Sequence, residues 1–379
     1  MRSKILFVVS DFYHGGAQRE MYEIDRALKR ENIEIVILCL LDLKSSRHFS
    51  DYFYEKHVAL NTKIIFLKDI IKPYKKTIFN KLLNKLGLFS INSTNANVLT
   101  TFLKDYKEVF FMGEYTYKKI EHYILADYNR RKNIFIMSAR FQGEHYRNIN
   151  KNNKYNFISP FDTKEQIEYE FEGFTDYSHI HFPLSLSIDT SMNKWSFKNN
   201  QVKRIGIFTR LSKSKPLDPF FYAFHLLLKD MPDTELHVYG AGDYKEAEYD
   251  RYINHLDLHK NVFFRGHQKD IKQTLNADDI DLVWFQGYLN RPAGYAGQDV
   301  IITGTPILLW DFYLGENKNL NNMDYVYPHF KDLSSFALAS KAVLQDQKLA
   351  NQIAQKQFSD IVNTRDINKN IERIKHIFS

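Results

Sequence analysis

The sequence contains a single cysteine, Cys39, among its 379 residues. One cysteine excludes an intramolecular disulfide and a cysteine-rich zinc site. Cys39 lies in an apolar run, Ile35–Leu41, and is predicted to be a buried small hydrophobic residue. This cysteine usage fits a protein of a reducing compartment.

Long apolar segments are also missing. No run approaches the ~18–20 apolar residues that a helix needs to span a bilayer. The first residues, MRSKILFVVSDF, form too short an apolar stretch for a signal peptide and turn polar too soon. We therefore expect a cytoplasmic protein, either soluble or peripheral on the inner face of the membrane.

Several catalytic signatures are absent as well. The histidines are scattered and none has the HExxH spacing of a zinc-binding helix, so no metal site is predicted. There is no GxSxG elbow and no Walker-type loop. Serine hydrolase and P-loop NTPase functions therefore lack support.

Charge of one sign is only slightly in excess. The formal net charge is +7 and the isoelectric point is near 9.0. Such an excess permits anionic partners, namely nucleotide phosphates, anionic lipid or nucleic acid. The basic residues do not gather into one nucleic-acid-binding module, so we expect no nucleic-acid partner.

What the sequence does contain is a regular alternation of strands and helices. Lys4–Ser10 and Ile33–Leu41 are continuous apolar runs, and Ala17–Arg30 between them has helical spacing. This order is typical of a βαβ unit in a parallel sheet. Further strands are predicted in the same half of the chain at Lys63–Leu67, Glu108–Met112, Asn133–Met137 and Tyr155–Ile158.

A second α/β series starts at Val202, after the polar stretch Phe182–Asn200. Its predicted strands are Arg204–Phe208, Glu235–Tyr239, Asn261–Phe264, Asp281–Phe285 and Pro306–Trp310, and its predicted helices are Pro219–Lys229, Glu246–Leu256, Lys269–Leu275, Ser334–Gln345 and Gln347–Val362. We predict two doubly wound, Rossmann-like domains facing a cleft. They span residues 1–185 and 203–355, and a C-terminal helix within 356–379 could cross back to the first domain.

The turn after the first strand is the first candidate site. It reads DFYHGGAQR, from Asp11 to Arg19. Gly15 and Gly16 let the backbone pass close to a ligand, and the helix from Ala17 offers free N–H groups to an anion. The alternative is a plain βα turn that needs a glycine.

A basic loop follows the first strand of the second domain. Arg210, Lys213 and Lys215 crowd the segment FTRLSKSKP. Phosphate recognition favours arginine as a bidentate fork and lysine as a point charge. The alternative is a solvated basic turn.

The segment Gly294–Pro306, GYAGQDVIITGTP, is the third candidate. Gly294 and Gly297 open a predicted helix and Gly304 closes it, and a helix N-terminus fronted by glycines suits a phosphate or a sugar oxygen. Asp299 could hold a ribose hydroxyl, or could instead complement the helix dipole.

A basic amphipathic helix is predicted from Tyr74 to Phe89. Lysines alternate there with isoleucine, leucine and phenylalanine. This pattern favours contact with an anionic membrane surface through residues 74–89. A surface helix that packs its apolar face on the domain has the same pattern.

Together these motifs resemble the GT-B glycosyltransferases of the glycogen-synthase-like, bacterial polysaccharide and lipopolysaccharide group. The turn HGGAQR resembles that group's GGAER turn, and TRLSKSKP resembles its GRL-x-x-x-KG motif, with Arg210 and Lys215 at the matching spacing. NVFFRGH, ending at His267, resembles the strand whose end lies near the nucleotide base. GYAGQDVIITGTP resembles the segment that carries a Glu–seven residues–Glu pair followed by GTP.

The resemblance implies roles for these residues. Arg210 and Lys215 would hold the donor diphosphate and act in catalysis. The donor would also be bound by the residues Gly15, Gly16, Gly294, Tyr295, Asp299 and His267. There would be no cofactor, and the donor would be a nucleotide sugar, most often a UDP-sugar. In this chain Asp299 replaces the second glutamate of the pair and Arg291 replaces the first.

The resemblance further implies retention at the anomeric carbon and independence of metal. If the enzyme inverts instead, a base from the first domain is needed, and His14, Glu114, His145 and Asp11 are candidates. The expected acceptor is a saccharide, in particular a lipid-linked one, used in cell-surface polysaccharide synthesis. Two alternatives remain: a catalytically inactive GT-B partner protein, and a nucleotide-sugar epimerase on the same fold.

Overall fold

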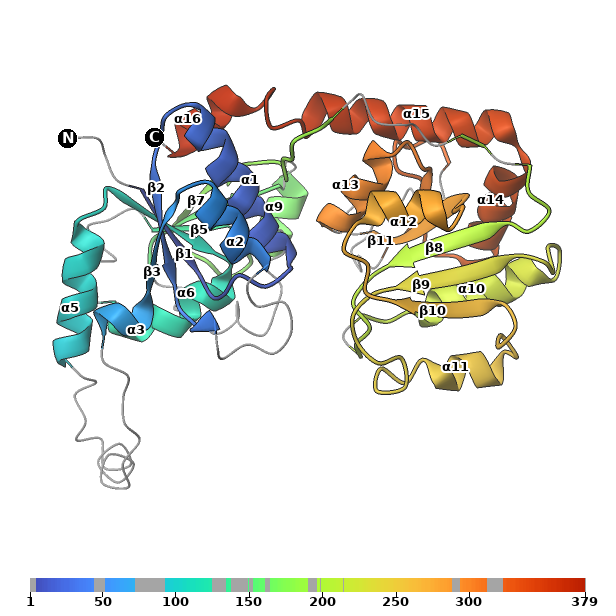
Figure 1. The fold of residues 1–379 in the computed structure, drawn as a ribbon, viewed down its shortest axis with the longest axis horizontal. Helices are drawn as coiled ribbons and strands as arrows, with labels where there is room; N and C mark the ends of the chain where they lie inside the picture. The colour runs from blue at the N-terminus through green and yellow to red at the C-terminus, as the bar shows by residue number, and fades with distance from the viewer. Residues whose placement is uncertain are drawn as a thin grey trace, which may run out of the picture. The chain divides into compact units, whose positions relative to one another are not determined.

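The computed structural model describes residues 5–43, 52–71, 93–124, 134–137, 149, 153–160, 164–189, 196–197, 199–213, 215–287, 294–311 and 323–378. The chain divides into two compact units (Figure 1). Unit 1 comprises Met1–Ser187 and Arg365–Ser379, and unit 2 comprises Ile188–Thr364. Residues 356–364 complete the last helix of unit 2, and the return to unit 1 begins at Arg365.

Unit 1 is built on a seven-stranded parallel sheet in the order β3-β2-β1-β4-β5-β6-β7. The strands are β1 Ile5–Val9, β2 Ile35–Cys39, β3 Lys63–Phe66, β4 Glu108–Met112, β5 Ile134–Met137, β6 Tyr155–Ser159 and β7 Tyr177–His181. Among the inner strands, β1 and β5 are apolar along their whole length and β4 is apolar after Glu108, because helices cover both faces, as is usual for parallel sheets.

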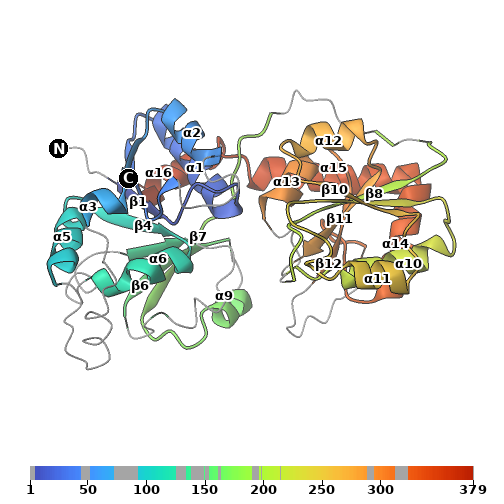
Figure 2. The same cartoon turned by 60° about the horizontal axis from the view of Figure 1, so that its bottom comes forward.

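Helices cover the two faces of this sheet as separate layers (Figure 2). One layer holds α1 Gly16–Arg30, α2 Tyr52–Ala59 and α16 Ile371–Phe378. The other holds α3 Leu67–Ile70, α5 Ser93–Lys104, α6 Glu114–Ile120, the 3-10 turn η2 Glu121–Tyr123 and α9 Lys164–Glu170.

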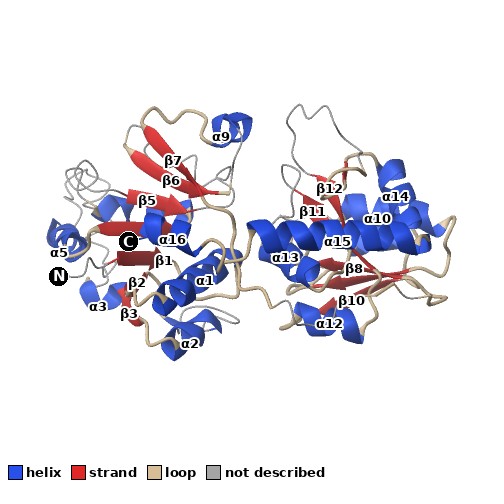
Figure 3. Cartoon of the chain, turned by 90° about the horizontal axis from the view of Figure 1, so that it is seen from above, coloured by secondary structure: helices blue, strands red, loops and turns tan. Residues whose placement is uncertain are grey.

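The C-terminal segment completes the core of unit 1. Phe378 is fully buried, with its ring 5.5 Å from that of Phe7 and 4.8 Å from that of Phe110. Leu186 exchanges backbone hydrogen bonds of 2.9 Å with Arg365 and Ile367, so the outgoing and the returning chain run together. Figure 3 shows α16 lying beside α1.

Unit 2 repeats this plan with six parallel strands in the order β10-β9-β8-β11-β12-β13. They are β8 Arg204–Phe208, β9 Glu235–Tyr239, β10 Val262–Gly266, β11 Leu282–Gly287, β12 Ile307–Asp311 and β13 His329–Phe330. On one face pack α10 Asp218–Leu228, α11 Asp250–His255 and α14 Leu333–Gln345, and on the other α12 Ile271–Ala277, α13 Tyr295–Ile302 and α15 Gln347–Thr364. The core on the face covered by α10, α11 and α14 centres on Trp284, whose Nε1 donates to Ser340 Oγ at 2.9 Å.

Both sheets have one point at which the chain reverses the direction in which it adds strands. In unit 1, β2 and β3 lie on one side of β1 and β4 lies on the other; in unit 2, β9 and β10 lie on one side of β8 and β11 on the other. Ligands of doubly wound sheets bind outside the carboxyl ends of the strands at this point. The segments after β1, β4, β8 and β11 are therefore where each unit can hold a ligand.

The structure confirms the doubly wound architecture and the burial of Cys39. Burial raises the pKa of its thiol to about 12, so the thiol is inert. Among the described helices, none combines the length and apolar character that crossing a bilayer requires. The predicted amphipathic helix at 74–89 lies outside the described residues.

Candidate functional site

The basic loop of unit 2 follows β8 at the switch point, as its position in the sequence predicts. Arg210 is exposed there, and within the described part of the chain its guanidinium has no hydrogen bond or ion pair. Lys215 is half-buried on the same loop. Gln286 of β11 donates to the Pro216 carbonyl at 3.2 Å and so ties the loop to the strand across the switch point.

Two glycines hold this loop by letting the backbone of the next strand come very close. Thr209 donates to the Tyr239 carbonyl at 2.9 Å and Leu211 donates to the Ala241 carbonyl at 2.8 Å. A Cβ on Gly240 would lie 1.6 Å from the Thr209 carbonyl oxygen, and one on Gly242 would lie 2.2 Å from the Leu211 oxygen. No other residue fits at either position, so the path of the loop is sterically fixed.

A buried tyrosine also fixes the loop, and the sequence analysis did not identify it. The Tyr249 hydroxyl accepts from the Ser212 amide at 3.3 Å and lies 2.9 Å from the Ser212 carbonyl oxygen and 2.5 Å from that of Lys215. Tyr249 is 3% exposed, and burial raises the pKa of its phenol. It is a positioning residue for Lys215. The two lie 34 positions apart, so no local motif could reveal the contact.

The third basic side chain of the loop has a different partner. The Lys213 ammonium lies 2.6 Å from the Glu248 carboxylate, and both side chains are exposed. The hydrogen bond from Lys213 lowers the pKa of Glu248. Exposed pairs of this kind contribute little to stability. Lys213 thus already has an ion-pair partner at the surface, and in this it differs from Arg210.

The glycine-rich segment forms the helix that its pattern predicts. Gly294 is the N-cap of α13 with a φ of 89°, a conformation that favours glycine. Tyr295 is buried, and Asp299 is half-buried in the second turn. The first turn of α13 has no acidic residue, which leaves the positive end of its helix dipole without a carboxylate from that turn. Gly304, with a φ of 79°, follows the helix.

His267 lies just past the end of β10, after Gly266 in a left-handed conformation with a φ of 73°. Burial and the neighbouring Lys269 lower the pKa of its imidazole. The ring is therefore neutral at neutral pH and can form a hydrogen bond with an uncharged group. Because β10 is an edge strand two positions from β8, His267 lies at the flank of the loop cluster.

In unit 1 the glycine turn is held by side chains. Asp11 Oδ1 accepts from the Tyr13 amide at 3.0 Å and from Gln18 Nε2 at 2.7 Å, and its Oδ2 accepts from Ser10 Oγ at 2.8 Å. Three hydrogen bonds make Asp11 a structural cap of the turn. Gly15 is the N-cap of α1 in an extended conformation, and Gly16 begins the helix.

Two of the candidate bases of unit 1 flank the switch point. His14 stacks on Tyr52 with ring centroids 3.9 Å apart, which fixes the plane of the imidazole. Glu114 is half-buried and begins α6, directly after β4. Since β1 pairs with β4, the structure brings these two residues to neighbouring strand ends. His145 and Arg291 lie outside the described residues.

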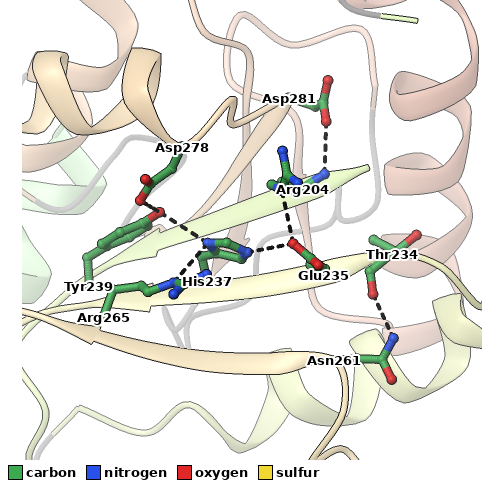
Figure 4. A network of polar contacts seen from close by, with 9 residues as sticks. All are labelled: Arg204, Thr234, Glu235, His237, Tyr239, Asn261, Arg265, Asp278 and Asp281. Atoms are coloured by element: carbon green, nitrogen blue, oxygen red, sulfur yellow. Dashed lines mark hydrogen bonds and ion pairs between the residues drawn. The ribbon is translucent and has the colours of Figure 1, made fainter. Parts of the chain in front are cut away.

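A second polar cluster in unit 2 runs along β9 rather than beyond the strand ends (Figure 4). His237 Nε2 lies 2.9 Å from Glu235, which also pairs with Arg204, while His237 Nδ1 accepts from Arg265 Nε at 3.3 Å. The Tyr239 hydroxyl donates to Asp278 at 2.6 Å. His237 is 2% exposed, and burial lowers its pKa. These residues join β8, β9 and β10 and belong to the scaffold.

The second half of the chain is similar in sequence to a known protein family. Residues 189–359 match the family "Glycosyl transferases group 1". Poly(glycerol-phosphate) alpha-glucosyltransferase of Bacillus subtilis (strain 168) is 25% identical over 166 residues, which are 41% of this chain and 22% of that protein.

Solved GT-B structures match the chain over its whole length. TarM from S. aureus aligns with a TM-score of 0.69 and 14% identity, covering 100% of both chains. HepE from Anabaena aligns with a TM-score of 0.67 and 16% identity over 99% of both chains. Sucrose-phosphate synthase from Thermosynechococcus elongatus aligns with a TM-score of 0.67 and 11% identity, over 100% of this chain and 98% of that one. The chain therefore has the GT-B fold, and its second half carries the match to the glycosyl transferases group 1 family.

Proposed function

We propose that this glycosyltransferase moves a sugar from a UDP-sugar to a saccharide acceptor, with retention of configuration and without a metal. The observation that carries the proposal is the basic loop after β8, held at the switch point of the group 1 domain. Two of the solved neighbours support the choice of ligands. HepE was crystallised with UDP and glucose, and TarM with UDP, fondaparinux and α-GlcNAc-glycerol.

In the proposed mechanism the loop stabilises the leaving diphosphate. As the bond from the anomeric carbon to UDP breaks, negative charge develops on the β-phosphate, and fixed positive charge there lowers the barrier. Arg210 and Lys215 supply that charge, and the N-terminus of α13 at Gly294 adds the positive end of a helix dipole. With two cations in place the leaving group needs no metal ion. Asp299 holds the ribose, and His267 lies beside the base.

Gly15 and Gly16 are proposed as donor-binding residues of unit 1. Retention fits the side chains around them, because it requires no strong base near the acceptor hydroxyl. Asp11 is occupied by three hydrogen bonds and His14 is stacked on Tyr52. The α-glucosyl transfer in the name of the Bacillus subtilis relative also supports it. Analysis of the product anomer by NMR tests retention, and an inverted product would instead assign a base role to His14, Glu114 or His145.

The acceptor is proposed to be a saccharide of cell-surface polysaccharide synthesis, carried by a lipid and presented at the cytoplasmic membrane face. The basic amphipathic sequence at 74–89 supports this part of the proposal. Changing Lys75, Lys76 and Lys81 to glutamate should weaken binding to anionic vesicles and slow transfer to a lipid-linked acceptor. Unchanged vesicle binding and activity would remove the membrane from the proposal.

The first experiment is thermal unfolding with a panel of nucleotides and nucleotide sugars. One UDP-sugar should raise the melting temperature of the wild type, and Arg210→Ala with Lys215→Ala should abolish that rise. Lys213→Ala is the matched control, because Lys213 lies on the same loop but pairs with Glu248. Stabilisation should persist in EDTA if no metal takes part.

Two other outcomes of this experiment decide between functions. A folded wild type that no nucleotide stabilises would favour a non-catalytic partner protein, an alternative that Asp299 motivates because aspartate is shorter than the usual glutamate. Isomerisation of the nucleotide sugar in the absence of any acceptor would identify an epimerase.

A further inference from the structure

An exposed aromatic ring with a lysine over it lies at the strand ends of unit 1. Tyr115 is 40% exposed, among the highest values for large apolar or aromatic side chains in the described chain. The Lys119 ammonium lies 4.2 Å from the centroid of its ring. The two residues are one helical turn apart on α6, so they share a face of that helix.

The exposure of Tyr115 follows from the way α6 is anchored. Gly113, with a φ of 93°, donates to the Phe111 and Met137 carbonyls at 3.0 and 2.8 Å and so fixes the turn from β4 into α6. Thr116 Oγ1 donates to the Met112 carbonyl at 2.8 Å. Tyr117 is fully buried, 5.1 Å from Phe111. With Thr116 and Tyr117 turned into the core, Tyr115 is held outward on a fixed helix.

The same anchoring places the start of α6 at the switch point. Helix α6 packs on β1, β4 and β5 (Figure 2). Because α6 begins directly after β4, which pairs with β1, its first turn lies at the carboxyl ends of these two strands. This is the position in unit 1 where a ligand of the sheet would bind.

The pair has the chemistry to recognise a sugar that carries an anion. The C–H face of a sugar ring stacks on an aromatic ring, which offers a large rigid surface at little cost in conformational entropy. An ammonium group binds a phosphate as a point charge. A neutral saccharide would need the tyrosine alone.

We propose that unit 1 binds an acceptor in which phosphate lies next to a sugar ring, with the ring on Tyr115 and the phosphate on Lys119. This inference rests on the proposed function, since an acceptor presupposes transfer. A phosphodiester-linked glycan and a saccharide joined to a lipid diphosphate share this chemistry. Tyr115 and Lys119 determine specificity and bind substrate, and they take no part in bond cleavage.

The test measures the affinity of the full chain for three soluble probes by NMR titration: glucose 1-phosphate, methyl α-glucoside and glycerol 3-phosphate. Glucose 1-phosphate should bind most tightly. Tyr115→Ala and Lys119→Ala should each lower its affinity by about three- to tenfold, since one contact to a charged group is worth up to that much at an exposed site. Tyr115→Phe and Lys119→Arg should retain most of the affinity.

Lys118→Ala is the matched control, because Lys118 lies next to Lys119 but pairs with Glu121 at 2.8 Å. Equal affinity for glucose 1-phosphate and methyl α-glucoside, or an affinity that the variants leave unchanged, would overturn the proposal. Stabilisation by the UDP-sugar is followed in the same variants. If it survives while glucose 1-phosphate fails to bind, this inference fails and the donor site stands.

Transfer assays then separate the two sources of the phosphate. Poly(glycerol phosphate) and an undecaprenyl diphosphate-linked saccharide are offered with the donor, and the Lys119→Ala loss should appear with the true acceptor. Vesicles of phosphatidylglycerol form the last arm. If Lys119→Ala weakened vesicle binding but left the affinity for glucose 1-phosphate intact, the pair would be a membrane contact and the proposal would be wrong.

Discussion

The two units hold their strand-end turns by different means. In unit 2 the loop after β8 is fixed by backbone contact, because Gly240 and Gly242 leave no room for a side chain. In unit 1 the turn after β1 is fixed by side chains, through the carboxylate of Asp11 and the stack of His14 on Tyr52. Steric contact with backbone cannot adjust, whereas side-chain contacts can. The loop of unit 2 therefore tolerates no side chain at its two glycines, whereas the turn of unit 1 can adjust to changes in the residues that hold it.

Among the variants that test this comparison, Gly240→Ala should lose the most stability. Its Cβ would meet the Thr209 carbonyl at 1.6 Å, and only a shift of the backbone can relieve the clash. We expect a loss of about 3 kcal/mol or more in the free energy of unfolding. All three tryptophans lie in unit 2, so urea unfolding followed by tryptophan fluorescence reports on this unit. The UDP-sugar should no longer stabilise the variant.

The matched control is Gly15→Ala in the turn of unit 1. A Cβ there would meet Gln18 Oε1 at 2.7 Å, which is the end of a flexible side chain, and the φ of −131° suits any residue. Urea unfolding followed by circular dichroism should show a loss below about 1 kcal/mol. Equal losses in the two variants would contradict the distinction between a backbone-fixed and a side-chain-fixed turn.

The sequence predicts the elements better than the contacts between them. Apolar runs locate eleven strands almost to the residue, because a strand covered on both faces reads as continuous hydrophobic sequence. Two described strands are missed: β7, whose sequence YSHIH is half polar because it is an edge strand, and β13, which has two residues. The sequence patterns set no bounds for α2, α3, α5, α6 and α9, and α16 was expected only as a helix within 356–379.

The candidate site shows the same limit. Glycines and basic residues after strands are visible in the sequence, so the positions of Arg210, Lys215 and Gly294 could be predicted. Tyr249 could not, because its contact to the loop joins residues far apart in the chain. The pair of Tyr115 and Lys119 has the spacing of an ordinary helical pair. Only the burial of Tyr117 shows which side of α6 is exposed.

The units also differ in the buried groups that titrate, and the variant Glu20→Gln tests this difference in unit 1. Glu20 of α1 is 7% exposed, and burial raises its pKa to about 8. The unfolded chain ionises near 4.5, so the stability from this group is full below pH 4.5 and is lost as the pH rises to 8. Glutamine removes that loss. We expect it to stabilise unit 1 by on the order of 2 kcal/mol at pH 8.5 and by little at pH 4.5.

Urea unfolding at the two pH values, followed by circular dichroism, measures this effect. Glu34→Gln is the control, because Glu34 is an exposed carboxylate just before β2. It should change the stability of the protein equally little at both pH values. A Glu20→Gln variant that is no more stable than the wild type at pH 8.5 would show that the carboxyl is ionised and solvated in the folded protein.

The smallest effect is expected in unit 2 and has the opposite sign. Burial lowers the pKa of His237, and its Nδ1 already accepts from Arg265, so a second proton there would break that hydrogen bond. The unfolded chain binds the proton near pH 6.5, so stability is full above that pH and falls as the solution is acidified. One proton limits the slope to about 1.4 kcal/mol per pH unit. His237→Gln should flatten the acid dependence of the tryptophan-detected unfolding free energy between pH 6.5 and 5, at the cost of a small loss at pH 7.5. An unchanged slope would assign the acid sensitivity of unit 2 to another group and leave His237 as a purely structural link between β9 and β10.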